Sequence, residues 1–565
     1  MHSLQSVEFR CACATSGKER WHTCVLGKSL IIATNRFMSK KYFDIHAPVF
    51  YPSAIIILIF IGLTLGIGEP MEEIFSKTTA GITTNAGWLL VLAVNIFLAF
   101  SLYFAFSKMG KIRLGGPKAK PDFSTFAWFA MLFSAGMGIG LLFFSVAEPI
   151  LHYSNPPRGA TNPATAAQDA MKFTFLHYGL HAWAIYAIVG MSLAFFTFNK
   201  KLPLTLRSVF YPLLGDRIHG PIGNIIDVVA VVATLFGLAT SLGFGVQQVS
   251  AGLAHLFDTP DTVSMQVFLI AAITGAATVS VVLGLDKGVR VLSELNMRMG
   301  LIFLIAMLIL GPTVFLMDSF IQNTGAYLQE LISIGAWTES YAGTTWQHDW
   351  SVFYWAWWIS WSPFVGMFIA RVSKGRTVRE FFLGVLLVPS LLTFLWMSVF
   401  GGSALFLELN GIGDIATAVN ENIATALFVL LEEYPWSFVT SIIGILLVTS
   451  FFVTSSDSGS LVIDSITSGG KLDAPVGQRI FWALSEGAVA ATLLLGGGLK
   501  ALQTAAISTG LPFTLLLFVM CYSLYKGLSR EFEDMQQQKQ LKERESYRQV
   551  LSELIAKRQK KNKVD

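Results

Sequence analysis

Long runs of apolar residues constrain this chain more than any other feature. About twelve runs are long enough to cross roughly 30 Å of hydrocarbon as an α-helix, which takes about 20 residues. They lie near 52–68, 86–107, 124–147, 173–197, 223–253, 264–285, 299–318, 350–371, 381–406, 436–458, 479–497 and 501–525. Because lipid offers the backbone no hydrogen-bond partner, such runs fold as helices. The sequence therefore predicts an all-α membrane protein with twelve transmembrane helices.

Composition supports lipid as the solvent of this chain. Apolar residues make up 53% of the 565 residues and charged residues only 13%, about half the charged share of an ordinary soluble domain. The four cysteines are three near the N-terminus, Cys11, Cys13 and Cys24, and Cys521 in the last apolar run. This spacing predicts neither a disulfide framework nor a metal site.

The charges of the loops predict the orientation of the chain. Lys and Arg gather in alternate loops, including 108–120, 200–217, 287–298 and 371–379, whereas 254–263, 319–349 and 407–435 contain none. Because positively charged loops stay in the cytoplasm, both termini are predicted to be cytoplasmic. Residues 1–50 form an N-terminal segment in which Met38 resembles a natural start, so we expect 1–37 to be an artefact. Residues 526–565 form a charged helical tail, interpreted either as a solvated tail or as a regulatory one.

Two apolar runs contain helix-breaking residues near their middle. The third run contains Gly136-Met137-Gly138-Ile139-Gly140, and the eighth contains Ser362-Pro363-Phe364-Val365-Gly366. Irregular backbone at membrane depth is tolerated only where it lines a cavity or is buried in protein. Counted from the third run, these are the first and sixth of ten helices, so a matched pair of broken helices is predicted at a binding site. The alternative is that the glycines only allow close helix packing.

Aromatic residues are concentrated in the eighth run. Four of the fourteen tryptophans lie within 355–361, and the fourth run adds Tyr178, Trp183 and Tyr186. A quaternary ammonium group has no N–H to donate and cannot lose its charge. Aromatic faces attract such a cation by about 2 kcal/mol or more per desolvated contact. The alternative is an aromatic belt at the membrane interface, and His177 and His181 are interpreted as packing residues because no third metal ligand accompanies them.

These stretches resemble the betaine/choline/carnitine transporter family (BCCT). The likeness rests on Gly136 to Gly140 with Glu148-Pro149, on the runs 180–187 and 203–208, and on 355–381, and it covers about 45–530. It implies two extra helices (51–107) followed by a five-plus-five inverted-repeat core of leucine-transporter type, with the repeats at 124–322 and 350–525. It also implies a homotrimer in a bacterial inner membrane, with a small quaternary-ammonium substrate, a lipid partner, no cofactor, no enzymatic activity and no nucleic acid.

The resemblance implies roles for particular residues. Trp183, Tyr186 and Trp358 match the cage around the ammonium group, and Tyr178 stands where the glycine betaine carriers often have Trp. The remaining implied substrate contacts are Trp357, Trp361 and Phe364 in an inner vestibule, with Met137, Gly138 and Gly140 beside the substrate carboxylate. The implied sodium ligands are Ser134, Met137, Phe451, Thr454 and Ser455.

Two functions within the family stay open at this stage. The first is sodium-coupled import of glycine betaine or a related compatible solute for osmoprotection. The second is proton-coupled transport of choline, against which Gly140 argues, because choline-carrying members commonly have aspartate at this position. The hydroxyl groups of Thr454 and Ser455 have a further interpretation, since such groups in membrane helices often bond to their own helix backbone. A channel is less expected because no selectivity-filter sequence or ring of charges is present.

Overall fold

The computed structural model describes residues 43–136, 138–283, 289–471 and 474–561. Helices form the body, and within these ranges there is no β-strand beyond one isolated bridge between Arg113 and Thr377. The long helices are α2 (Ala47–Ile67), α3 (Pro70–Phe106), α4 (Thr125–Gly136), α5 (Ile139–Ser154), α6 (Pro163–Tyr178), α7 (Leu180–Phe198), α9 (Pro221–Phe257), α10 (Val263–Leu283), α11 (Val289–Leu310), α12 (Thr313–Gly335), α14 (Ser351–Val372), α15 (Val378–Leu409), α18 (Ser437–Thr467) and α19 (Val476–Lys561). The predicted all-α class is confirmed, while residues 1–37 lie outside the described ranges.

By length and hydropathy, nine helical segments of the described chain could each cross a membrane. The predicted run 124–147 is absent from these nine because it is divided between α4 and α5. The run 350–371 lies in α14, and the runs 479–497 and 501–525 both lie in α19. Within α19 the backbone departs from helical geometry at Gly497 and Gly498, where two helices meet at a kink. The protein is therefore a multi-pass membrane protein, and the twelve-helix repeat arrangement stays a prediction.

Of three helix breaks in the body, one agrees with the sequence-based expectation and two differ from it. The third run is interrupted as predicted, because α4 ends at Gly136 and α5 begins at Ile139. The fourth run, predicted as one helix, is divided at Gly179 between α6 and α7. The seventh predicted run, 299–318, is not one helix. The helix α11 ends at Leu310, and a separate helix, α12, begins after Pro312.

The predicted break in the eighth run is wrong. The helix α14 continues from Ser351 to Val372 with Pro363 in its interior. Proline removes one N–H from the helix and normally leaves the carbonyl four residues earlier without its partner. Here that carbonyl belongs to Ile359, and the hydroxyl of Ser362 donates to it at 2.7 Å. The hydroxyl group therefore replaces the missing amide donor, and the helix continues.

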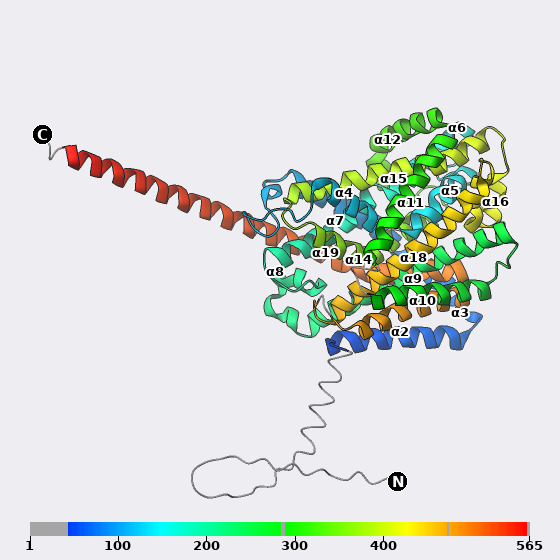
Figure 1. The fold of residues 1–565 in the computed structure, drawn as a ribbon, viewed down its shortest axis with the longest axis horizontal. Coiled ribbons are helices and arrows are strands. Elements are labelled where there is room, and N and C mark those ends of the chain that lie inside the picture. The colour runs from blue at the N-terminus through cyan, green and yellow to red at the C-terminus, as the bar shows by residue number, and fades with distance from the viewer. Residues whose placement is uncertain (1–42, 137, 284–288, 472–473, 562–565) are drawn as a thin grey trace, which may run out of the picture.

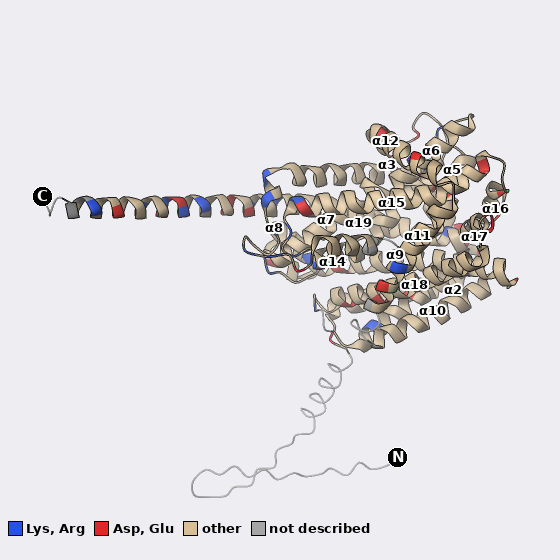
Figure 2. Cartoon of the chain, turned by 45° about the horizontal axis from the view of Figure 1, so that its top comes forward, with Lys and Arg blue, Asp and Glu red and all other residues tan. Residues whose placement is uncertain are grey.

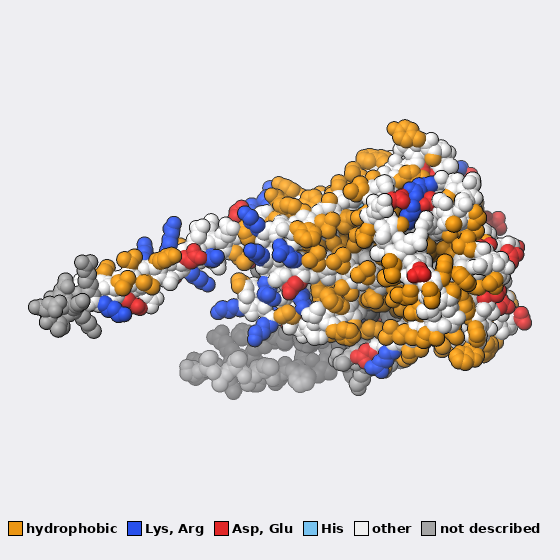
Figure 3. All heavy atoms as spheres, turned by 90° about the horizontal axis from the view of Figure 1, so that it is seen from above, with side chains coloured by type: hydrophobic (Ala, Val, Ile, Leu, Met, Phe, Trp, Pro, Cys, Tyr) orange, Lys and Arg blue, Asp and Glu red, His pale blue; other side chains and the backbone are white. Residues whose placement is uncertain are grey.

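The exterior of the body is apolar along its sides and charged at its ends. Figure 3 shows hydrophobic side chains over most of one flank. The exposed apolar residues of α2 include Ile55, Leu58, Ile59 and Leu63, as expected of a helix that faces lipid. Lys and Arg gather at the end from which the C-terminal helix leaves the body, and Asp and Glu lie mainly at the opposite end (Figure 2). The two ends therefore differ in charge, as the loops predicted.

The most buried helix of the body is α14. It packs against α7, α9 and α19, segments far apart in the sequence that lie together in the body (Figure 1). Its tryptophan side chains Trp355, Trp357, Trp358 and Trp361 are all buried. Residues of an interfacial belt would lie at the membrane boundary, so the belt interpretation does not fit this helix.

Candidate functional site: a buried aromatic cluster

The predicted cage residues come together around Trp358. Trp183 and Tyr186 lie one turn apart on α7, with ring centroids 5.6 Å apart. The ring of Trp358, on α14, lies 6.5 Å from that of Tyr186 and 5.5 Å from that of Tyr178 at the end of α6. All four side chains are buried. Three helix segments thus bring four aromatic rings to one place, as attraction of a cation to ring faces requires.

The predicted vestibule residues continue this cluster along α14. The ring of Trp357 stacks on that of Trp358 with centroids 4.6 Å apart, and the ring of Trp361 lies 6.1 Å from that of Trp358. Phe364 follows, 5.7 Å from Trp361. The indole N–H of Trp357 donates to Ser241 on α9, and that of Trp358 donates to the carbonyl of His177. The indole nitrogen of Trp361 is buried without a partner among the described residues.

The glycines of the break face these tryptophans. A Cβ atom on Gly140 would lie 2.7 Å from Cη2 of Trp357, and one on Gly138 would lie 3.1 Å from Cη2 of Trp361. Gly138 precedes the first residue of α5 and has an extended backbone. Backbone N–H groups at a helix N-terminus attract anions, so the start of α5 offers donors beside the rings. Met137 lies outside the described residues.

The break at Gly179 places Tyr178 at the cluster. Gly179 is the residue between α6 and α7, and a Cβ atom there would lie 2.8 Å from Cζ of Phe394 and 2.9 Å from the hydroxyl of Tyr327. The same hydroxyl accepts a hydrogen bond at 3.1 Å from the N–H of Leu180, at the start of α7. An otherwise unpaired helix N-terminal donor is thereby satisfied. A Cβ atom there would also collide with the carbonyl oxygen of Phe175, so the close packing at this position leaves no room for a side chain.

A buried polar cluster next to the rings was missed by sequence analysis. Glu148 on α5 accepts hydrogen bonds from His177 at 2.6 Å, from His152 at 3.1 Å and from the hydroxyl of Tyr354. The Nε2 atom of His177 contacts the hydroxyl of Ser351 at 2.8 Å. The signal available in the sequence was Glu148 itself, because an ionisable residue within a membrane span is a functional candidate.

This cluster does not have the spacing of a metal centre, although Glu148, His152 and His177 lie close together. Ligand atoms bound about 2.0–2.1 Å from a tetrahedral zinc ion lie more than 3 Å apart. The Nδ1 atom of His177 is only 2.6 Å from the carboxylate oxygen, which is a hydrogen bond. His181 does not join this cluster, because its Nε2 atom contacts Asn95 on α3.

The predicted sodium ligands lie on two helices. Phe451, Thr454 and Ser455 are on α18, and Ser134 is near the end of α4. The Thr454 hydroxyl donates to the carbonyl of Ser450 at 2.9 Å, and the Asn296 amide donates to it at 3.2 Å. The hydroxyl therefore bonds to its own helix, which was the alternative interpretation of this residue. The sodium site stays a prediction.

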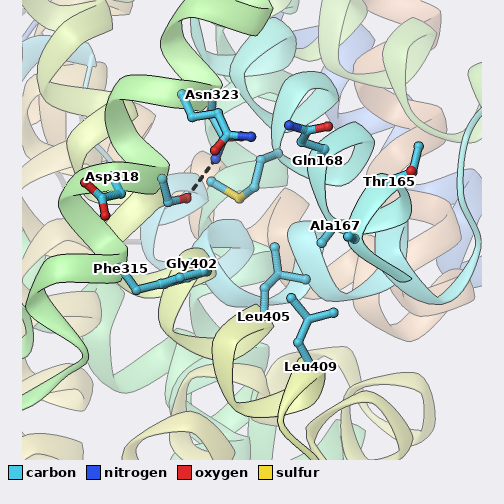
Figure 4. Close-up of a pocket in the computed structure, with 13 residues that line it drawn as sticks. Thr165, Ala167, Gln168, Phe315, Asp318, Asn323, Gly402, Leu405 and Leu409 are labelled. Carbon is cyan, nitrogen blue, oxygen red and sulfur yellow. Dashed lines mark hydrogen bonds between the residues drawn. The ribbon is translucent and has the colours of Figure 1, made fainter. Parts of the chain in front are cut away.

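A cavity of about 280 Å³ lies away from the aromatic cluster. It opens between α6, α12 and α15, where Gln168, Asp318, Asn323, Gly402 and Leu405 are among its lining residues (Figure 4). Its lining contains no residue of the cage and one aromatic residue, Phe315. The cavity therefore lacks the group of rings that the predicted substrate requires.

Ion pairs join α6 to α12. Glu330 on α12 accepts from Lys172 at 2.6 Å and from Arg158 at 2.7 Å, and Arg158 also contacts Asp169. Burial alone raises the pKa of Glu330, but hydrogen bonds from Lys172 and Arg158 outweigh it and hold the pKa below its ordinary value. The contact between the two helices is therefore charged at neutral pH.

Comparison with known proteins places this geometry in context. The sequence model described as BCCT, betaine/carnitine/choline family transporter, matches residues 48–533. A glycine betaine/proline/choline/ectoine transporter of Vibrio parahaemolyticus is 49% identical over 503 residues, covering 87% of this chain and 89% of the relative. Glycine betaine transporter 1 of the same organism is 48% identical, covering 87% and 96%. A glycine betaine transporter of Bacillus subtilis is 45% identical, covering 84% and 92%.

Proposed function

Because this chain belongs to the betaine/carnitine/choline family of transporters, we propose that it imports glycine betaine by sodium symport and thereby protects the cell against osmotic stress. The chain is a transporter and not an enzyme. The observation that carries the substrate proposal is the group of buried rings around Trp358, next to the broken helix α4–α5. Rings attract the trimethylammonium group, and the N–H groups at the start of α5 suit the carboxylate.

The proposed coupling follows from the charge balance of the cycle. Glycine betaine is a zwitterion, so each sodium ion carried with it brings one positive charge inward. A potential of 100 mV then supplies about 2.3 kcal/mol per ion, which is more than tenfold accumulation. The hydroxyl groups of Thr454 and Ser455 on α18, with Ser134, Met137 and Phe451, are the proposed ligands.

We further propose an arrangement of twelve spans with both termini in the cytoplasm of a bacterial cell and the body in its inner membrane. In this arrangement α4 with α5 and α6 with α7 each form one interrupted span, and α19 supplies two. Ten of the spans form two inverted repeats, and three copies of the chain assemble into a homotrimer. The gathering of Lys and Arg at the end where the C-terminal helix emerges supports the cytoplasmic position of that end.

Uptake in cells that lack other carriers tests the proposal. Labelled glycine betaine, choline and carnitine are supplied separately, with sodium or with potassium as the external cation. The proposal predicts accumulation of betaine that requires sodium and persists when a protonophore is added at constant membrane potential. Uptake that ignores sodium and stops with the protonophore would instead favour the proton-coupled choline carrier. Choline is included in this test because the relative that is 49% identical is named as a transporter of glycine betaine, proline, choline and ectoine.

A further inference from the structure

The carboxylate of Glu148 connects three helices behind the aromatic cluster. Glu148 lies on α5 and is fully buried. Within the described part of the chain, its hydrogen-bond donors are His152 on the same helix, His177 on α6 and Tyr354 on α14. No Lys or Arg side chain is among these donors. An ionised carboxylate offers only acceptors, so Glu148 can receive all three hydrogen bonds.

The cluster continues from Glu148 to the cage through two hydroxyl groups. The proton of the Tyr354 hydroxyl points to Glu148, which leaves its oxygen free to accept. The hydroxyl of Tyr178 lies 3.2 Å from that oxygen and 3.0 Å from the carbonyl of Gly140, and it can donate its single proton to either acceptor. The ring of Tyr178 lies 5.5 Å from that of Trp358. Tyr354, whose hydroxyl donates to Glu148, thus contacts both the hydroxyl of Tyr178 and the ring of Trp358.

A second connection leads from Glu148 to Trp358. The ring of His177 stacks on that of Tyr354 with centroids 4.6 Å apart. The carbonyl of the same histidine accepts from the indole nitrogen of Trp358 at 2.9 Å. Glu148 therefore holds His177, whose carbonyl accepts from Trp358, and also Tyr354, which contacts Tyr178.

We propose that Glu148 is a positioning residue of the substrate site, which fixes the rings of Tyr178 and Trp358 through Tyr354 and His177. This inference rests on the proposed binding of a quaternary ammonium at these rings. Attraction between a cation and a ring depends on the cation lying over the ring face, so rings held in place bind more tightly than rings free to turn. Hydrogen bonds to an ionised acceptor are about twice as strong as neutral ones, which suits a carboxylate to this role.

Three variants test the connection: Glu148→Gln, Tyr354→Phe and the two combined. Glutamine has the size of glutamate but replaces one acceptor oxygen by a donor, so at least one of the three incoming hydrogen bonds is lost. Phenylalanine keeps the ring of Tyr354 and removes only the hydroxyl. Glu339→Gln is the matched control, because Glu339 is also a buried glutamate, and its partners are Thr344 and Gln347 in the 339–347 turn.

Purified proteins are titrated with glycine betaine and with tetramethylammonium, and the change in tryptophan fluorescence gives the affinity. We expect Glu148→Gln and Tyr354→Phe each to weaken both ligands about tenfold, the loss that corresponds to one hydrogen bond to a charged group. The double variant should bind no more than about twofold more weakly than either single variant. The control should bind both ligands like the wild type.

The outcomes separate this inference from the proposed function. If the wild type binds tetramethylammonium but does not bind betaine, the proposed substrate is refuted. The variants would then still test the role of Glu148 with the bare cation. Unchanged affinity in Glu148→Gln, or losses that multiply in the double variant, would overturn the positioning role. A uniform fall in the thermal midpoint with unchanged affinity would show that Glu148 only holds the helices together. Failure of the wild type to bind either cation would overturn both proposals.

Discussion

At the scale of single residues, the tryptophans of α14 differ in their surroundings. Trp358 contacts the rings of Tyr178 and Trp357 and has an occupied indole N–H, whereas the indole nitrogen of Trp361 has no described partner. A buried donor without a partner costs about 1–3 kcal/mol. The ring of Trp358 is therefore fixed by its neighbours, whereas the indole N–H of Trp361 is available to donate to a substrate or a water molecule.

Substitution of Trp358 tests whether its ring faces the cation. Trp358→Leu keeps part of the apolar volume and removes the aromatic face, so we expect a loss of about 2 kcal/mol, or roughly thirtyfold in the half-saturation constant of betaine uptake. Surface labelling should show normal amounts of the protein in the membrane. Trp128→Leu is the control, because Trp128 is buried on α4 and donates to Ser373 outside the cluster. Equal half-saturation constants in wild type and Trp358→Leu would exclude a cation contact.

Gly140 provides a test of substrate choice. A carboxylate at this position would repel that of betaine by about 4 kcal/mol at 4 Å and an effective dielectric near 20, and it would attract choline. Gly140→Asp should therefore weaken betaine transport relative to choline transport. The structure adds a steric cost, since any Cβ atom here meets Trp357 at 2.7 Å.

The control for this substitution is Gly140→Ala, which has the same Cβ atom and no charge. Steric displacement of Trp357 affects both variants, so only the ratio of choline to betaine uptake reports the charge. Competition of each unlabelled solute against each labelled one gives this ratio. A wild type that already prefers choline, or equal ratios in the two variants, would show that Gly140 does not select the substrate.

Removal of two hydroxyl groups on α18 tests the sodium proposal. Thr454→Ala with Ser455→Ala should raise the sodium concentration needed for half-maximal uptake by about tenfold or more, because sodium binds oxygen ligands and alanine offers none. Thr467→Ala on the same helix is the control, since its hydroxyl donates to the carbonyl of Ile463. The proposed ligands would be wrong if the sodium dependence of uptake were the same in all three proteins.

At the scale of elements, α14 shows how a helix remains continuous around proline. Ser362→Ala removes the hydroxyl that bonds to the carbonyl of Ile359, and an unsatisfied buried acceptor costs about 1–3 kcal/mol. We expect a lower midpoint of thermal unfolding in detergent. Ser101→Ala on α3 is the matched control, because its hydroxyl donates to Phe97 at 2.8 Å in a helix segment without proline. Equal shifts in the two variants would mean that Ser362 does not compensate for Pro363.

At the scale of the whole molecule, the C-terminal helix extends from the body as one exposed rod (Figure 1). Its first part is attached, since Glu531 pairs with Lys200 at 2.6 Å and Phe532 and Met535 pack on the core. Beyond this part the side chains are exposed and rich in Lys, Arg and Glu. We propose that this outer part senses ionic strength at an anionic membrane surface or at another subunit.

Truncation after Gln536 tests this proposal and keeps the attached part. Attraction to anionic lipid is about 1 kcal/mol per nearby basic residue and weakens as salt rises. The truncated protein should therefore transport betaine at the same maximal rate but respond to osmolality over a different range. Proteoliposomes with and without anionic lipid give the two activation curves. Identical curves for the full-length and truncated chains would leave the tail without a sensing role.

The sequence by itself determined the features that depend on local chemistry. Transfer of apolar residues from water to lipid is a property of each segment, so the membrane class and the approximate positions of most of the long helices followed from hydropathy. The break before α5 followed from Gly138 and Gly140, and the aromatic cluster followed from four tryptophans on one short segment. These signals lie within a few residues of one another, so no other helix was needed to interpret them.

Only the tertiary structure decided features that depend on partners from distant segments. The close packing around Gly179 involves Tyr327 and Phe394, which approach from α12 and α15. Glu148 becomes the centre of a cluster because residues from three helices meet there. A buried carboxylate is stable only when such donors surround it, and the sequence does not state which side chains from other helices will reach it.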